Sequence, residues 1–444
     1  MKRNSKRCNI FTGVAALILA LSCLMVSCGM NSQPAATTPP AASGDATALP
    51  GEHNDGMPDP ADPSEKMIQE MMADMTLEEK VGQMFFLAYR KNADGDKVQK
   101  MDDTLEEILS TYRPGGFALF ADNLDSIEQT VSFIEALQAG SKIPMFISVD
   151  EEGGIVSRLN KAPKLHSTVM PEAYTIGLTK RPEYAYAAAR AIASEILSLG
   201  FNMDFAPVAD IYSNPANKVI GKRAYGTEPE LVSGMVSQAV AGFIDGQVIP
   251  VLKHFPGHGD TLEDTHTGAA LVEHDLERLT SFELLPFQEG IAAGADAVMI
   301  AHILLPNLME EPVPATLSKE VVTGLLREKL KFDGVVITDA MEMSAVSAYY
   351  DDDEAAVMAV LAGVDMILMP QSTEKAYHAI LAAVKDGQIS EERIDESVYR
   401  ILRMKAKYGI LDNNLVRPDP EKILGSPEHQ ALADAIREAA EQQD

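Results

Sequence analysis

The fold is decided by one stretch, residues 248–268, which reads VIPVLKHFPGHGDTLEDTHTG. Its first five residues are apolar and predict a short buried strand. The sixteen residues that follow contain three histidines, two aspartates and a glutamate, a density of polar side chains that a protein core does not hold. Pro256, Gly257 and Gly259 disfavour regular structure, so residues 253–268 are expected to form a loop at the carboxyl end of that strand.

The same arrangement, an apolar run that leads through polar residues into a helical stretch, recurs along the chain. Eight strands that alternate with helices favour an α/β fold, a (β/α)8 barrel of the TIM type, over an open doubly wound sheet. No glycine-rich nucleotide-binding pattern opens a helix. The eight runs are residues 84–87, 116–120, 144–149, 201–206, 248–252, 297–300, 334–337 and 366–369, and the clearest helices are 124–139, 182–199, 229–245, 276–293 and 318–330.

Polar residues stand at or just past the carboxyl ends of several predicted strands. On a barrel these ends face one mouth, where enzymes of this fold have their active sites. Residues that are scattered along the sequence therefore become one candidate site. They are Asp150, Asp204, Lys253 with His254, His302 and Asp339.

The first 27 residues differ from the rest of the chain. Basic residues at positions 2, 3, 6 and 7 precede an apolar run at 14–21, and Cys28 follows small residues typical of a processing site. The apolar run is shorter than the roughly twenty residues that a membrane span needs. The pattern resembles a bacterial lipoprotein signal with Cys28 as the lipidated N-terminus. There are two alternatives. Cys23 could be the lipidated residue, or the segment could be an ordinary secretory signal that is cleaved at another position.

Cysteine content and charge limit the possible partners. All three cysteines lie at or before Cys28, so the exported domain is expected to be held by its core without disulfides. Of the 37 basic residues four lie within residues 1–27, which contain no acidic residue, so the mature chain carries 33 basic against 66 acidic residues. This charge disfavours nucleic acid as a partner and disfavours an anionic membrane except through a lipid anchor.

The composition predicts four segments along the chain. These are a signal peptide at 1–27, a disordered tether at 28–63, a (β/α)8 catalytic domain at 64–412 and a C-terminal helical extension at 413–444. A capping box at Thr76 and Glu79 is expected to start an early helix. We expect a single catalytic domain, because the residues after Gly409 suffice for one helix, 427–442.

Three motifs together carry a resemblance to a known family. KHFPGHG at 253–259 with DTH at 264–266, DEEGG at 150–154 and FAPVAD at 205–210 resemble the β-N-acetylglucosaminidase branch of glycoside hydrolase family 3. The resemblance covers roughly residues 68–410. It implies a catalytic barrel, no cofactor, and hydrolysis that retains the anomeric configuration through a covalent intermediate on an aspartate.

The resemblance also implies the catalytic residues. Asp339, in VITDAMEM at 336–343, would be the nucleophile, and His266 would be the general acid and base. Asp264 would bind the His266 imidazole and hold its pKa near the working pH. These are the two roles that a retaining glycosidase requires. Because the dyad lies on a glycine-containing loop, we expect it to move during turnover.

Substrate contacts are implied in the same way. Arginine offers a planar fork of donors that suits neighbouring sugar oxygens. His258 is expected to stabilise its loop, and Asp210 and His302 are expected behind the site or at its rim. The residues that match the substrate-binding positions of the family are Asp150, Arg158, Arg223, Lys253 and His254.

Two other classes of protein remain open from the residues alone. A hydrolytic metal ion such as zinc could bind imidazole and carboxylate side chains of the 254–266 stretch, but their spacing matches no standard zinc pattern, and we expect no metal. A non-catalytic glycan-binding lipoprotein would lack the nucleophile, and Asp339 is present. Insensitivity to chelators would argue against the first class, and turnover of an aryl N-acetylglucosaminide against the second.

We therefore expect a monomeric, retaining exo-β-N-acetylglucosaminidase, lipid-anchored on the outer face of the bacterial cytoplasmic membrane. It would release terminal β-linked N-acetylglucosamine from peptidoglycan fragments. The alternatives are another β-glycoside, such as a chitooligosaccharide or a glucoside, and a phosphorolytic enzyme that uses phosphate instead of water.

Overall fold

The computed structural model describes residues 63–261, 270–309, 313–412 and 415–443. The predicted signal peptide, Cys28 and the predicted dyad of Asp264 and His266 lie outside these residues. The chain divides into two units, Met1–Gly56 and Met57–Asp444, and every described residue belongs to the second.

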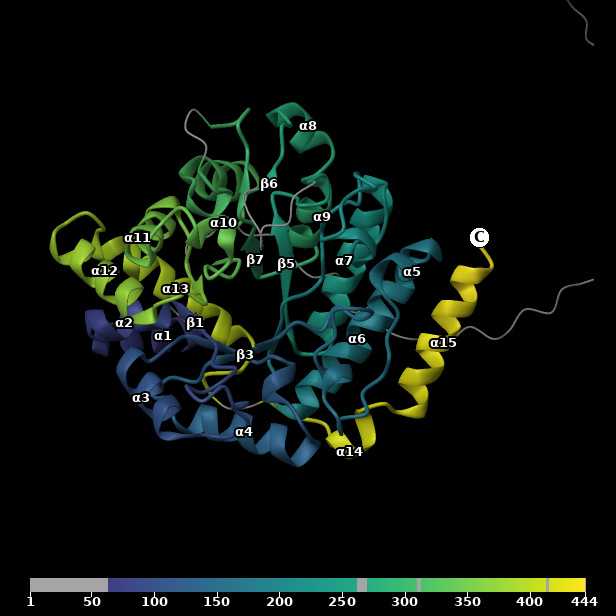
Figure 1. Cartoon of the computed structure of the whole chain (residues 1–444), viewed down its shortest axis with the longest axis horizontal. Coiled ribbons are helices and arrows are strands. Elements are labelled where there is room, and N and C mark those ends of the chain that lie inside the picture. Colours follow the sequence, from purple (N-terminus) through teal and green to yellow (C-terminus); the bar gives the residue numbers. More distant parts are fainter. Residues whose placement is uncertain (1–62, 262–269, 310–312, 413–414, 444) are drawn as a thin grey trace, which may run out of the picture. The chain divides into compact units, whose positions relative to one another are not determined.

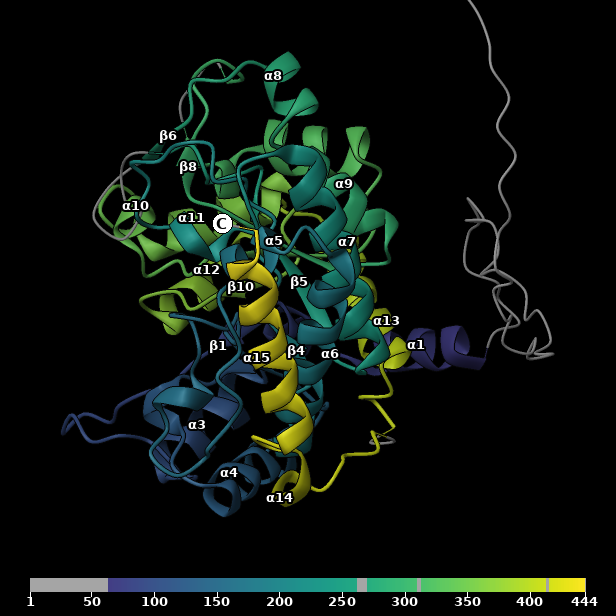
Figure 2. The same cartoon turned by 90° about the vertical axis from the view of Figure 1, so that its right-hand side faces the viewer.

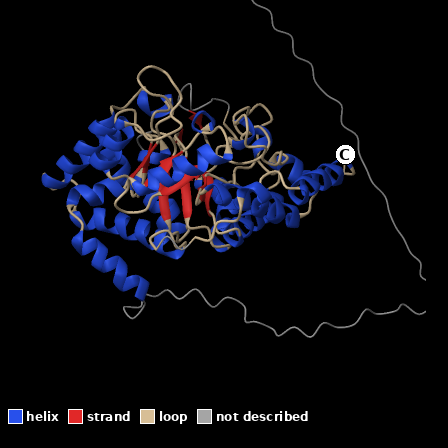
Figure 3. Cartoon of the chain, turned by 90° about the horizontal axis from the view of Figure 1, so that it is seen from below, coloured by secondary structure: helices blue, strands red, loops and turns tan. Residues whose placement is uncertain are grey.

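Eight parallel strands form the centre of this second unit (Figures 1 and 3). They are hydrogen-bonded in the order β10-β1-β2-β3-β4-β5-β7-β9. The end strands meet through a bridge between Ile337 and Met366, where the Thr338 N–H donates to the Met366 carbonyl oxygen at 3.0 Å. The sheet thus closes into a barrel, as predicted. Its strands are β1 (Phe85–Leu87), β2 (Gly116–Ala118), β3 (Phe146–Val149), β4 (Met203–Asp204), β5 (Ile249–Phe255), β7 (Ala297–Ile300), β9 (Val335–Thr338) and β10 (Ile367–Leu368).

Helices surround the barrel (Figure 3). None in the described part of the chain is long and apolar enough to cross a membrane. The α-helices are α1 (Pro63–Asp74), α2 (Leu77–Gln83), α3 (Asp103–Tyr112), α4 (Ile127–Ala139), α5 (Ala173–Leu178), α6 (Pro182–Leu199), α7 (Pro229–Asp245), α8 (Leu276–Ser281), α9 (Leu285–Ala292), α10 (Ser344–Ser347), α11 (Asp352–Ala362), α12 (Thr373–Lys385), α13 (Glu391–Lys407), α14 (Pro420–Ile423) and α15 (Pro427–Glu441). Short 3-10 turns are η1 (Ala121–Asn123), η2 (Leu159–Lys161), η3 (Gly221–Arg223) and η4 (Ala315–Leu317), and η5 (Glu320–Lys329) is a π-helix.

Local sequence signals set several helix ends. The predicted capping box is confirmed, because Thr76 Oγ1 accepts from the Glu79 N–H at 3.2 Å and Glu79 Oε2 accepts from the Thr76 N–H at 3.1 Å. Pro182 and Pro229 open α6 and α7, where a missing N–H costs nothing. Helix α6 ends at Gly200, whose φ of 107° only glycine adopts readily.

The single helix predicted over 276–293 is wrong, since the chain forms α8 and α9 with a break between them. The hydroxyls of Thr280 and Ser281 donate to the carbonyl oxygens of Leu276 and Glu277, at 2.6 and 2.9 Å, in the last turn of α8. Such bonds compete with the helical ladder. Pro286 then starts α9, and its ring cannot continue a preceding helix.

The prediction that a loop begins at residue 253 is also wrong. Strand β5 continues to Phe255, which pairs with Ile300 of β7, and Lys253 forms a bridge with Val208. Lys253 and His254 therefore project from the barrel wall, which fixes their positions more firmly than a loop would. A separate pair of short strands, β6 (Ala270–Leu271) and β8 (Ile303–Leu304), was not predicted.

Aromatic rings and one lysine fill part of the barrel interior. The Phe86 ring lies 6.5 Å from that of Phe146 and 5.3 Å from that of Phe205, measured between centroids. Lys405 reaches in from α13, and its Nζ donates to Gln83 Oε1 at 2.8 Å and lies 5.1 Å from the Phe146 ring centroid. Its burial lowers the pKa of Lys405 to about 7.

Candidate active site

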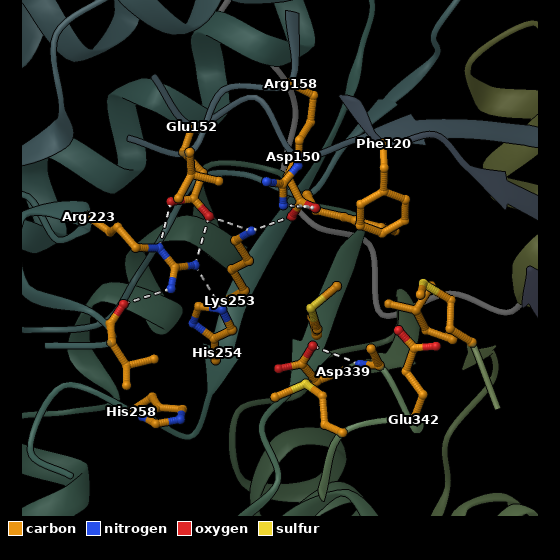
Figure 4. Close-up of a pocket in the computed structure, with 18 of the residues that line it drawn as sticks. Phe120, Asp150, Glu152, Arg158, Arg223, Lys253, His254, His258, Asp339 and Glu342 are labelled. Atoms are coloured by element: carbon orange, nitrogen blue, oxygen red, sulfur yellow. Dashed lines mark hydrogen bonds and ion pairs between the residues drawn. The ribbon is translucent and has the colours of Figure 1, made fainter. Parts of the chain in front are cut away.

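A pocket of about 330 Å³ lies at the carboxyl ends of the barrel strands (Figure 4). Asp150 directly follows β3 and Asp339 directly follows β9, whereas Lys253 and His254 lie within β5. Arg158 directly precedes the 3-10 turn η2, and Arg223 is the last residue of η3. Seven residues singled out in the sequence line the pocket, namely Asp150, Arg158, Arg223, Lys253, His254, His258 and Asp339.

Ion pairs run along one side of the pocket (Figure 4). Lys253 Nζ lies 2.9 Å from Asp150 Oδ1 and 2.6 Å from Glu152 Oε1. Arg223 donates two hydrogen bonds to the Glu152 carboxylate, at 2.9 and 2.8 Å, and Arg158 Nη2 donates to Asp150 Oδ2 at 3.0 Å. Two carboxylates and three cations therefore hold one another in place.

These ion pairs determine the charge state of the pocket wall. Burial alone would raise the pKa of both carboxylates, but Lys253 and Arg158 hold the pKa of Asp150 well below its usual range. Arg223 and Lys253 likewise lower the pKa of Glu152 to about 2. Burial would lower the pKa of Lys253, yet the two carboxylates raise it. Because both carboxylates are ionised at neutral pH, neither suits the role of proton donor.

His254 is oriented from behind the pocket by Asp210. Its Nδ1 lies 2.7 Å from Asp210 Oδ2, and its Nε2 lies 3.3 Å from Arg223 Nη2. The backbone N–H of His258 donates to Asp210 Oδ1 at 2.6 Å, so one fully buried carboxylate positions both histidines. Burial, aided by the neighbouring imidazole of His254, lowers the pKa of His258.

Asp339 lies across the pocket from the Arg223 side (Figure 4). Its Oδ1 accepts a hydrogen bond from the Ala340 N–H at 2.7 Å. Burial alone would raise the pKa of Asp339, but the imidazoles of His302 and His254 and the Ala340 N–H hold it below its usual range. The carboxylate is therefore ionised, which is the state that a nucleophile needs.

His302 and Thr338 support Asp339 and do not line the pocket. His302 Nε2 lies 3.1 Å from the Ala340 carbonyl oxygen, and its Nδ1 lies 3.1 Å from Thr316 Oγ1. Thr338 Oγ1 accepts from the N–H of Leu368 at 2.9 Å. This hydroxyl ties the end of β9 to β10, directly before the carboxylate.

Two buried carboxyl groups shape the loop after β3. Asp204 Oδ1 accepts from the Glu151 N–H at 2.9 Å, and Glu151 Oε2 accepts from the N–H groups of Arg158 and Leu159 at 2.8 and 3.1 Å. Burial raises the pKa of both groups, that of Glu151 to about 7. Asp204 stands at the end of β4 but lies behind the pocket.

The rim of the pocket combines a cation, an anion and an aromatic ring. Arg90 Nη2 donates to Glu342 Oε1 at 2.6 Å. The guanidinium carbon of Arg90 lies 4.9 Å from the centroid of the Phe120 ring, and that of Arg158 lies 5.5 Å from it. Such contacts orient both guanidinium groups.

Comparison with known proteins identifies the family to which this site belongs. Residues 76–404 match the model of the glycosyl hydrolase family 3 N-terminal domain. The chain belongs to glycosyl hydrolase family 3. It is 34% identical over 403 residues to β-hexosaminidase A of Pseudoalteromonas piscicida, covering 82% of this chain and 67% of that protein.

Two solved structures extend the comparison. A family 3 β-N-acetylglucosaminidase from Paenibacillus is 42% identical, with a TM-score of 0.77 over 82% of this chain and 69% of that one. A β-glucoside phosphorylase is 26% identical, with a TM-score of 0.77 over 85% and 67% of the respective chains. The predicted family, its β-N-acetylglucosaminidase branch and the class of glycoside hydrolase are confirmed.

The described residues of this family 3 enzyme do not form a metal-binding site. Residues 63–261, 270–309, 313–412 and 415–443 contain no group of three or more His, Cys, Asp or Glu side chains arranged to bind one. The two ring nitrogens of His254 face the Asp210 carboxylate and the Arg223 guanidinium, and a guanidinium repels a metal cation.

Several residues of the family 3 pocket were missed in the sequence. Glu152 stands inside the DEEGG motif, yet no role was given to it, and Arg90, Phe120 and Glu342 were not singled out. One signal could have found Glu152. A buried cation needs a carboxylate partner, and Lys253, Arg158 and Arg223 could not all be paired with Asp150 alone.

Proposed function

We propose that this protein is a retaining exo-β-N-acetylglucosaminidase that releases terminal β-linked N-acetylglucosamine. The observation that carries the proposal is the ionised carboxylate of Asp339, which faces a wall of fixed donors and acceptors formed by Asp150, Lys253 and Arg158. The wall would hold the sugar hydroxyls while Asp339 approaches the anomeric carbon. A pocket of about 330 Å³ is near the small end of ligand sites, which suits one terminal sugar.

The proposed reaction has two steps. In the first, a carboxylate oxygen of Asp339 forms a bond to the anomeric carbon, the bond to the leaving oxygen breaks, and His266 gives that oxygen a proton. In the second, His266 takes a proton from water, the water oxygen bonds to the anomeric carbon, and the bond to Asp339 breaks. The second inversion restores the original anomeric configuration.

His266 is the proposed proton donor. Asp150 and Glu152 are held in ion pairs, and Glu342 accepts a 2.6 Å hydrogen bond from Arg90. Among the described pocket carboxylates, Glu342 is the one rival donor, since Asp339 has the other role. The family resemblance favours His266, with Asp264 as its partner.

Peptidoglycan fragments are the proposed natural substrates. Their muramic acid residues and stem peptides carry carboxylates, which require local positive charge in an exported chain with 33 basic and 66 acidic residues. The Arg90 side chain, which is paired with Glu342, is 41% exposed at the rim, and its guanidinium lies next to the Phe120 ring that Arg158 also contacts. This edge would receive the part of the substrate beyond the scissile bond.

The location is part of the same proposal. Export with lipidation at Cys28 would hold the enzyme on the outer face of the cytoplasmic membrane, next to peptidoglycan. A single acyl chain binds a membrane only marginally, so at least two chains are needed for stable anchoring. The segment between Cys28 and α1 would serve as the tether.

Phosphorolysis is the second candidate reaction, and it is supported by the structural similarity of this chain to a β-glucoside phosphorylase. One product assay separates the two reactions. Purified muropeptides and an aryl N-acetylglucosaminide are incubated with and without phosphate, and with a chelator. Hydrolysis gives free N-acetylglucosamine in every case, whereas phosphorolysis gives the sugar 1-phosphate only with phosphate. Absence of turnover on both substrates would overturn the proposed function.

A further inference from the structure

The loop after β3, residues 150–172, carries Asp150 and Arg158, two of the pocket-lining residues that are proposed to hold the sugar. Asp150 stands at its start, and Arg158 reaches back to Asp150 Oδ2 at 3.0 Å. The loop folds on itself, because the Gly154 N–H donates to the Met170 carbonyl oxygen at 2.9 Å and Ser167 Oγ donates to Asn160 Oδ1 at 2.8 Å. The far end of the loop, residues 166–170, is therefore bonded to Gly154 and Asn160, which lie on either side of Arg158.

One buried carboxylate holds that far end, and it comes from α6. Glu195 is 4% exposed. Its Oε2 accepts from the Thr168 N–H at 3.1 Å and its Oε1 accepts from Thr168 Oγ1 at 2.5 Å. The same Oε1 lies 2.9 Å from His429 Nδ1 and accepts from the Gly425 N–H at 3.2 Å. Glu195 thus joins the loop to the C-terminal segment that contains α14 and α15.

The C-terminal segment also contacts the loop directly. A Cβ atom placed on Gly425 would lie 2.2 Å from the carbonyl oxygen of His166, so only glycine fits there. Further along, the Arg437 guanidinium donates to the Val169 carbonyl oxygen. Helix α15 packs alongside α5 and α6 (Figure 2), with Ala433 and Ile436 buried. These contacts restrain residues 166, 168 and 169 from one side.

We propose that the segment 420–441 is a positioning brace for the sugar-binding loop, with Glu195 as the residue that joins the two. Residues Gly425, His429 and Arg437 fix residues 166–169, and the internal bonds of the loop carry this restraint to Arg158. Glu195, Gly425, His429 and Arg437 do not line the pocket. The effect on catalysis rests on the proposed function, but the restraint on the loop does not.

Gly425→Ala in the full chain tests the brace, with Gly387→Ala as its matched control. Both glycines have a positive φ, 57° and 76°, so alanine is strained at both. Nothing lies within 4 Å of a Cβ at Gly387, whereas the Cβ at Gly425 meets His166. We expect amide hydrogen exchange over residues 154–170 to rise about tenfold in Gly425→Ala and to stay at the wild-type level in Gly387→Ala.

A second pair of variants tests the same proposal if Gly425→Ala does not fold. His429→Ala removes one contact to Glu195, and Glu438→Ala changes an exposed residue of the same helix. His429→Ala should raise exchange over 154–170 and raise KM about five- to tenfold with kcat within about twofold, since Arg158 serves binding. Glu438→Ala should change neither.

Two results would overturn the brace. The first is a rate of amide hydrogen exchange over residues 154–170 that is the same in each variant as in its control. The second is a variant in which amide hydrogen exchange over residues 154–170 is raised but KM is unchanged. A wild-type enzyme without turnover on N-acetylglucosaminides would instead count against the proposed function, and the exchange comparison, which needs no substrate, would still decide whether the segment restrains the loop.

Discussion

Glu152 is the shared counterion of Lys253 and Arg223. Its Oε1 lies 2.6 Å from Lys253 Nζ and 2.8 Å from Arg223 Nη2, and the three side chains are 3 to 15% exposed. Removal of one partner from a buried set of charges leaves the others unpaired, which costs more than the pair itself contributes. Two cations of the pocket wall thus depend on a residue from a different strand end.

Glu152→Gln is therefore expected to damage the site although it keeps the shape of the side chain. Lys253 and Arg223 would lose a negative charge and shift, and kcat/KM on an aryl N-acetylglucosaminide should fall by about 100-fold, mostly through KM. Glu183→Gln, which removes an exposed partner of Arg181, is the control and should stay within about twofold. A variant with wild-type KM would show that Glu152 does not position the wall.

The eight barrel strands could be predicted from the sequence because each is buried on both faces and contains an apolar run. The role of Glu152 could not be predicted in the same way, since it pairs with Lys253 about a hundred residues further along the chain. That contact exists only after the barrel has formed and brought the carboxyl ends of β3 and β5, which flank β4, to the same mouth.

The two wrong predictions have a common cause. Pro256 and the glycines indicated a loop from residue 253, but pairing of Phe255 with Ile300 extends β5 up to the proline. In 276–293, apolar periodicity indicated one helix, but hydroxyl bonds at Thr280 and the ring of Pro286 divide it. In the first case pairing with a neighbouring strand outweighed the turn signal, and in the second case local bonds outweighed the periodic pattern.

Asp339→Ala should abolish turnover, because it removes the atom that bonds the anomeric carbon. We expect a loss of at least about 1,000-fold in kcat on every substrate, whatever its leaving group. An unchanged melting temperature would confirm that the variant is folded. Intact-mass analysis of wild-type enzyme with a slow aryl substrate should show a glycosyl adduct that the variant lacks. A loss below tenfold would rule out Asp339 as the nucleophile.

Cys28→Ala is expected to abolish lipidation if the proposed anchor is correct. Metabolic labelling with a fatty-acid analogue, followed by fractionation, should mark the wild-type protein in the membrane fraction and leave the variant unmarked. Cys23→Ala is the matched control, because it removes the alternative acceptor and should be labelled like wild type. Equal labelling of Cys28→Ala and wild type would exclude Cys28.

Lys405→Met should stabilise the fold, most strongly at low pH. The pKa of Lys405 is lowered to about 7 by burial, against about 10.4 in an unfolded chain. Between these values the unfolded chain binds more protons, so wild-type stability rises with pH. Below about pH 7 the folded chain carries the full cost of a buried ammonium.

The gain in melting temperature from Lys405→Met should therefore be largest below about pH 7 and shrink toward pH 10. Lys385→Met, at an exposed position, is the control and should show no such trend. A gain that is independent of pH would mean that packing against Phe146, not charge, determines the effect.

His266→Ala separates the proposed acid and base from its rival Glu342. An aryl glycoside with an acidic phenol leaves without protonation, so the variant should form its glycosyl-enzyme and then stall for lack of a base. A disaccharide has a poor leaving group and should fail at the first step. Azide needs no deprotonation, so it should restore turnover of the aryl substrate and give a β-glycosyl azide.

Glu342→Gln is the variant to compare with His266→Ala. Among the residues that the structure describes, Glu342 is the carboxylate at the pocket rim that could donate a proton. If His266 is the acid and base, Glu342→Gln should lose activity about equally on disaccharide and aryl glycoside, mainly through KM, and azide should have no effect. If azide instead rescues Glu342→Gln and not His266→Ala, the proton passes through Glu342, and the assignment of His266 with Asp264 must be abandoned.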